Sequence, residues 1–204
     1  MPILDQTAAD RAIEPFKQDF IHIFQTAWKD WRESAIAPQM QDKRVRANNV
    51  WNQLLSHAKR RFDGMEGIRV ETKKPWTGVL IDGSIFVRMK LANQKLLSRN
   101  YPTKSALAFV DQNQELFGEG ISRAELVYLL DESETEIERI VLLQRHKNSV
   151  VWMIDILGEA PMSQNVFPFA EPPMPHTGGD IAKRIIKPKH KIEDEKHEVS
   201  NGAQ

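Results

Sequence analysis

Cysteine is absent from this 204-residue chain, which excludes disulfide bonds and thiolate chemistry and is typical of a reducing compartment. Neither sign of charge is in excess, because Lys plus Arg and Asp plus Glu both number 28, so no overall field attracts nucleic acid or an anionic membrane. No apolar run approaches the ~20 residues that a membrane helix needs, and the N-terminus lacks the basic and apolar regions of a signal peptide. These absences predict a cytoplasmic protein that does not associate with a membrane.

The chain also lacks a complete catalytic, nucleotide-binding or metal-binding motif. Its six histidines show neither HExxH nor another paired-ligand spacing, no GxSxG elbow is present, and no glycine-rich phosphate loop occurs. We therefore expect no metal and no cofactor, and we favour a binding role over an enzymatic one.

One pattern comes close to a nuclease motif. Asp82 followed by Arg88-Met89-Lys90 resembles restriction-type nucleases, in which an acid at a hairpin and an acid-x-Lys triplet together hold Mg²⁺. Here Arg88 occupies the place of the second acid, and a hard divalent cation needs several oxygen ligands. A structural role of Asp82 in a turn is the interpretation that we prefer.

The region 76–157 predicts an antiparallel sheet, beginning with a hairpin. Asp82-Gly83 joins two β-rich runs, 77–81 and 84–91, and this dipeptide favours a type I′ turn because both residues tolerate positive φ. Further strands are predicted at 106–111, 123–131, 136–146 and 150–157, with 68–72 as an edge strand. The linkers are judged too short for helical crossovers, so the neighbours are expected to pair antiparallel in five or six strands.

Two amphipathic helices precede the sheet. Apolar residues recur every three or four positions over 10–36 and again over 42–62, which indicates helices with one buried face each. Pro15 fits either a first helix that starts near Glu14 or a short initial turn from Thr7 that is broken at Pro15. Asp42 is the expected N-cap of the second helix, and Asp63-Gly64 its expected end.

The expected fold is α+β, with an N-terminal helical hairpin packed on the sheet in a single domain, 1–157. Five prolines punctuate the segment that follows, so 158–180 is interpreted as a Pro-rich arm or linker. The charged, aperiodic remainder, 181–204, is interpreted as a disordered tail.

Two groups of residues are candidates for binding. The first group combines cations with an aromatic residue, which is typical of anion or single-stranded nucleic-acid sites. It comprises Lys90, Arg99, Asn100, Tyr101 and Lys104. A solvated loop is the alternative interpretation. The second group is a candidate for a partner interface. It comprises Trp28 and Trp31 on the wide apolar arc of the first helix, and Phe167 and Phe169 in the Pro-rich segment.

Half of the chain resembles a known group of sequences. Arg88-Met89-Lys90, the run SRNYPTK at 98–104 that leads into ALAFVDQ, and the closing VVWMIDI are similar to a family of uncharacterised prophage and defence-locus proteins. Genes of that family stand beside one that encodes a helix-turn-helix domain joined to an ImmA/IrrE-type metallopeptidase-like domain. The resemblance implies a toxin–antitoxin or anti-phage pair, and it transfers no catalytic residue.

Two hypotheses follow. The preferred one is a protein-binding component of such a pair, which acts by complex formation with a partner from a neighbouring gene. The alternative is a nucleic-acid-binding or nucleic-acid-processing protein that uses the basic loop around Lys90 and Lys104.

Overall fold

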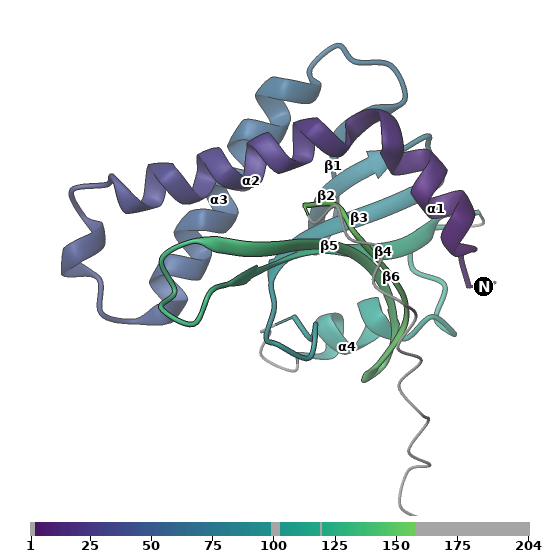
Figure 1. The fold of residues 1–204 in the computed structure, drawn as a ribbon. Coiled ribbons are helices and arrows are strands. Elements are labelled where there is room, and N and C mark those ends of the chain that lie inside the picture. The colour runs from purple at the N-terminus through teal and green to yellow at the C-terminus, as the bar shows by residue number, and fades with distance from the viewer. Residues whose placement is uncertain (1–2, 99–102, 119, 158–204) are drawn as a thin grey trace, which may run out of the picture. The chain divides into compact units, whose positions relative to one another are not determined.

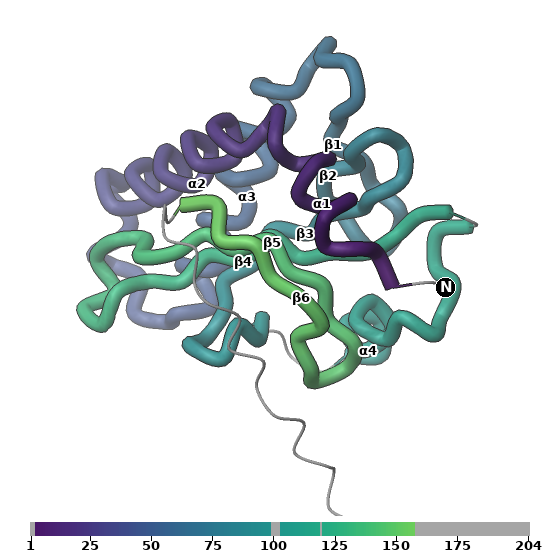
Figure 2. Tube along the Cα trace, turned by 45° about the vertical axis from the view of Figure 1, so that its right-hand side comes forward, coloured from purple at the N-terminus to yellow at the C-terminus, as the bar shows by residue number. Residues whose placement is uncertain are grey.

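The protein folds as a sheet with helices on both faces, seen here in a computed structural model that describes residues 3–98, 103–118 and 120–157. The helical elements are α1 (Gln6–Ile13), the 3-10 turn η1 (Glu14–Phe16), α2 (Lys17–Arg32), the 3-10 turn η2 (Ala37–Gln39), α3 (Lys43–Phe62) and α4 (Lys104–Val110). The strands are β1 (Ile68–Lys73), β2 (Trp76–Ile81), β3 (Ile85–Leu91), β4 (Ser122–Leu130), β5 (Ile137–His146) and β6 (Ser149–Asp155). Figures 1 and 2 both show α2 and α3 on one side of the sheet and α4 on the other.

The sheet has six strands in sequence order, and every neighbouring pair is antiparallel except β3 and β4. The α+β fold with a mostly antiparallel sheet is therefore confirmed. The strand predicted at 106–111 is wrong, because this segment forms the helix α4, capped by the Thr103 hydroxyl, which accepts from the Ala106 amide at 3.1 Å. A short apolar run fits a buried helix as well as a strand, and α4 is the crossover that a parallel pair requires.

The predicted hairpin is confirmed in detail. Asp82 and Gly83 adopt φ values of 47° and 66°, and the Ser84 amide donates to the Ile81 carbonyl at 3.0 Å. Asp82 therefore has the structural role in a turn that its sequence context favours.

The pairing of β2 with β3 is short and unusually close. It covers only Ile85 to Val87 of β3, after which β3 continues alongside β4 alone. A Cβ atom added at Gly78 would lie 2.3 Å from the Val87 carbonyl oxygen. Only glycine lets the two backbones approach this closely.

The N-terminal helix takes the second of the two predicted arrangements. α1 begins after Asp5, whose side chain accepts from the Ala8 amide, and the helix is interrupted by the 3-10 turn that contains Pro15 before α2 continues. In the second helix, Asp42 is the N-cap of α3 and Asp63 follows its last residue, as predicted.

The face covered by α1, α2 and α3 holds the main core. Trp28 and Trp31 are buried there, with 4% and 6% of their surface exposed. The Trp28 indole N–H also donates to the Thr135 carbonyl at 2.7 Å. The prediction that these two tryptophans form a partner interface is therefore wrong: they lie inside the domain, because α3 and the sheet cover the whole apolar arc of α2.

The start of the described chain is fastened to the last two strands. The Leu4 amide donates to the Gln144 side-chain oxygen at 3.0 Å, and the Trp152 indole donates to the Leu4 carbonyl at 2.7 Å. Both backbone groups of one residue are thus satisfied by side chains from β5 and β6, which fixes where α1 begins.

Several predicted features lie outside the described residues. These are the Pro-rich segment 158–180 with Phe167 and Phe169, the tail 181–204, and Arg99, Asn100 and Tyr101. Among the helices of the described ranges, none has the length and apolar character required to cross a membrane.

Candidate functional site

A layer of buried charge lies on the face of the sheet that carries α4. Alternation along β3 places Phe86 and Arg88 on this face, and the parallel register pairs Arg88 with Glu125 of β4. Apolar clusters flank the layer: one contains Phe86 and Phe109, and the other contains Val127 of β4 and Leu143 of β5. Charged side chains in such surroundings must be paired to be tolerated.

Two guanidinium groups share one carboxylate at the centre of this layer. Arg88 Nη2 donates to one Glu125 oxygen at 3.2 Å, and Arg145 Nη1 donates to the other at 3.3 Å. The exposed fractions are 5% for Arg88, 1% for Glu125 and 8% for Arg145. We call these three residues, together with Lys90, the charge cluster.

Neighbouring groups hold the two arginines in place. The Arg88 guanidinium carbon lies 4.1 Å from the centroid of the Phe109 ring, in a cation–π contact. Arg145 also donates to the Ser98 hydroxyl at 3.0 Å and to the Lys147 carbonyl at 2.9 Å. Helix α4 and the chain after β3 are thereby both attached to the cluster.

Lys90 lies at the edge of the cluster and is partly buried. Its ammonium nitrogen lies 5.6 Å from the centroid of the Trp51 ring on α3. Burial lowers the pKa of Lys90 to about 8, with a further contribution from the positive charge of Arg88. Burial also lowers the pKa of Arg88, so this site favours loss of positive charge.

Arg123 is a separate case, although it is fully buried on the same face. Its guanidinium donates to the Ala108 and Asp111 carbonyls at 3.2 and 2.8 Å and to the Gln112 side chain at 3.3 Å. These acceptors lie at the C-terminal end of α4, where a cation satisfies carbonyls that have no partner within the helix. Arg123 therefore has a structural role, which is to fasten α4 to β4.

The structure places only part of the predicted anion-binding group. Lys104 is exposed at the start of α4, and Lys90 belongs to the charge cluster. Sequence reasoning missed Glu125 and Arg145. The available signal was a charged residue at an inward position of each predicted strand. Glu125 shares a face of its strand with the apolar Val127, and Arg145 shares a face of its strand with the apolar Leu143.

Most cations of α3 already have partners within the chain. Lys43 and Arg46 both bind Glu134, at 3.0 and 2.8 Å, and Arg61 binds Asp19 at 2.7 Å. These pairs reduce the positive charge that α3 could present to a polyanion.

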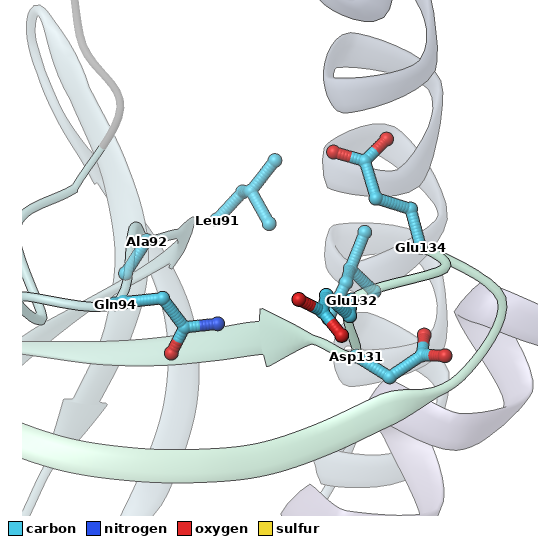
Figure 3. Close-up of a pocket in the computed structure, with 7 residues that line it drawn as sticks. Leu91, Ala92, Gln94, Asp131, Glu132 and Glu134 are labelled. Atoms are coloured by element: carbon cyan, nitrogen blue, oxygen red, sulfur yellow. The ribbon is translucent and has the colours of Figure 1, made fainter.

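A small acidic pocket opens where β3 and β4 end. It encloses about 140 Å³ and is lined by Leu91, Ala92, Gln94, Leu130, Asp131, Glu132 and Glu134. The three carboxylates point in different directions (Figure 3). Asp131 accepts from the amides of Thr135 and Glu136, both at 2.7 Å, and Glu134 holds two cations. The pocket is smaller than the ~300 Å³ of a typical small-molecule site, and two of its three carboxylates are engaged by the amides of the β4–β5 turn and by cations of α3.

Within the described ranges, no group of three or more His, Asp or Glu side chains is placed to hold a metal ion. Comparison of the chain with protein families, curated proteins and solved structures finds no match.

Proposed function

We propose that the protein is the protein-binding component of a two-gene system of the toxin–antitoxin or anti-phage type, and that it acts in the cytoplasm by complex formation. The type of system rests on the sequence resemblance of the region 83–157. The binding role is supported by one structural observation, an exposed apolar surface at the connection between α2 and α3.

This surface comprises Ile36, Met40 and Val45, and we call it the α2–α3 tip. The three side chains are 44%, 38% and 39% exposed, and they lie within ten residues of one another around the η2 turn. Large apolar side chains that are exposed close together in the chain are a feature of protein interfaces, in which methionine is also enriched.

The tip is held in a fixed position by the turn between β4 and β5. Arg32 donates to the Thr135 carbonyl at 3.0 Å, and Lys43 and Arg46 both bind Glu134. Figure 1 shows this turn beside the α2–α3 connection. A surface that is already ordered pays less entropy on binding, which favours a specific partner.

The same contacts weaken the nucleic-acid alternative. Phosphate contacts need accessible cations, whereas Lys43, Arg46 and Arg61 form ion pairs within the chain and Lys90 is partly buried. Among the described residues, the basic loop offers Lys95 and Lys104 as exposed cations.

A pull-down of the tagged full-length protein at native expression level tests the proposal. We expect one stoichiometric protein partner, encoded by a neighbouring gene. The triple variant Ile36→Ser/Met40→Gln/Val45→Thr should lose this partner. Leu107→Ser, at a 54% exposed apolar residue of α4, is the matched control and should retain it.

Because all these positions are exposed, the free energy of unfolding of each variant should lie within about 0.5 kcal/mol of the wild-type value. Recovery of the wild type alone or with nucleic acid would contradict the proposal. In the second case, a steep dependence of oligonucleotide binding on salt would favour the alternative. A partner that the tip variant retains fully would refute the assignment of the surface.

A further inference from the structure

Sulfur chemistry in this chain is confined to methionine. The sequence contains seven methionines and no cysteine, so an oxidant that attacks sulfur acts on thioethers alone. Peroxides convert a methionine to its sulfoxide, which replaces a flexible apolar side chain by a polar one. Reductases reverse this change, so a methionine whose oxidation leaves the fold intact has the properties of a switch.

Met40, in the α2–α3 tip, is the most exposed of the four methionines in the described ranges. Its side chain is 38% exposed, whereas Met89 is 1% exposed in the core. Met65 and Met153 are partly buried and pack against core clusters. Because susceptibility to oxidation follows exposure, we expect a peroxide to reach Met40 first among these four residues.

The backbone around Met40 is held by groups other than its own side chain. The Met40 amide donates to the Ala37 carbonyl at 3.1 Å, and Ala37 packs against the main core. Two residues after Met40, the Asp42 side chain accepts from the Arg44 amide at 2.8 Å and caps α3. A sulfoxide at Met40 leaves these contacts in place, so oxidation there changes the surface and not the fold.

We propose that Met40 is a redox modification site, and that its oxidation to the sulfoxide by a peroxide releases the protein partner from the α2–α3 tip. This inference rests on the proposed function, because it assigns a regulation to the same surface. In the reaction the thioether sulfur attacks one peroxide oxygen and loses two electrons. An S–O bond forms, the O–O bond breaks, and with hydrogen peroxide the second oxygen leaves as water.

The place of Met40 within the tip sets the size of the effect. It lies between Ile36 and Val45 in the chain, and all three side chains are exposed, so a partner that covers the tip covers the sulfur as well. Burial of a methionine side chain is worth at least about a tenfold change in a dissociation constant. A sulfoxide opposes that burial, because a polar group removed from water without a partner is destabilising. We therefore expect oxidation to weaken binding about tenfold.

Mass spectrometry of the full-length protein during treatment with hydrogen peroxide tests the assignment of the site. The fraction of sulfoxide is measured at each methionine over time, together with the Tm. We expect Met40 to be oxidised faster than Met65 and Met153, with Met89 the slowest, and the Tm to stay unchanged while Met40 reacts. Oxidation of Met40 no faster than that of Met89, or a Tm that falls in step with it, would overturn the inference.

A pull-down with oxidised bait tests the consequence for binding. The tagged protein is oxidised and freed of peroxide before it meets the lysate, so the partner itself is not oxidised. The readout is the ratio of partner recovered with and without oxidation, taken within each variant, so that a change in a variant's own affinity cancels. For the wild type we expect a ratio of about one tenth, restored by methionine sulfoxide reductases with dithiothreitol.

Two variants identify the methionine responsible. Met40→Leu cannot form the sulfoxide at the tip, so its ratio should be near one. Met153→Leu, at a partly buried methionine of β6, is the matched control and should show the wild-type ratio.

The failure of this inference differs from the failure of the proposed function. A wild-type ratio near one with Met40 fully oxidised overturns the inference alone, and so does an equal loss in Met40→Leu, because the loss then comes from another methionine. Absence of a partner from the untreated sample contradicts the proposed function, and this inference with it.

Discussion

Replacement of Lys90 by methionine is expected to stabilise the protein, although it deletes a charged residue that contacts an aromatic ring. The ammonium group is partly buried beside Arg88, and its pKa lies at about 8 instead of the ordinary 10.5. Keeping Lys90 protonated at neutral pH therefore destabilises the folded state relative to the unfolded chain. Methionine has a similar length and no charge to desolvate.

The magnitude follows from the two pKa values. A fall from 10.5 to about 8 corresponds to about 3 kcal/mol at neutral pH. The cation–π contact with Trp51 returns about 0.5–1 kcal/mol. After discounting for the partial exposure of Lys90, we expect Lys90→Met to raise the free energy of unfolding by about 1–2 kcal/mol at pH 7.

The pH dependence gives the decisive sign. Because the folded-state pKa is the lower one, the unfolded state holds more protons between about pH 8 and pH 10.5, so this group makes the wild type more stable as the pH rises through that window. The advantage of Lys90→Met should thus shrink by pH 10. Urea unfolding in phosphate-free buffer at pH 7 and pH 10 measures both values. A variant that is less stable at pH 7, or whose difference from the wild type is the same at both pH values, would refute the reasoning.

Two further outcomes follow from the backbone and the turns. Gly78→Ala should cost about 1–3 kcal/mol or more in urea unfolding, since its Cβ would meet the Val87 carbonyl at 2.3 Å; a neutral substitution would show that β2 and β3 separate easily. The pKa of Asp131 is lowered to about 2 by the Glu136 amide and the Ser133 hydroxyl. Its stabilisation is therefore present above about pH 4 and lost as the pH falls through 2, and Asp131→Asn should flatten stability curves recorded from pH 5 to pH 2.

Local signals in the sequence were enough where a turn or a cap determines the structure. Asp82-Gly83 predicted a hairpin because positive φ at two successive residues is a property of these residue types. Asp42 likewise predicted the start of α3 through the chemistry of its side chain. Such elements depend only on their nearest neighbours along the chain.

The sequence did not predict the structure correctly where tertiary contacts determine which element forms. The apolar run 106–111 is as suitable for a strand as for a helix, and its helical form is supported by Arg123 of β4, which donates to carbonyls at the end of α4. The same holds for the site: Arg88 and Arg145 become neighbours only through the register of β3, β4 and β5 around Glu125. No spacing along the chain expresses that register.

The fastening of Leu4 has a consequence for synthesis of the protein. Its acceptor and donor partners, Gln144 and Trp152, follow it by 140 and 148 residues. At ~5–20 residues per second, a ribosome needs roughly 7–30 s to make that length of chain. During this interval α1, whose Ala9 and Ile13 are buried in the finished fold, lacks the strand β6 that packs against it. The nascent N-terminal helices are therefore a natural substrate for chaperones until the last strand emerges.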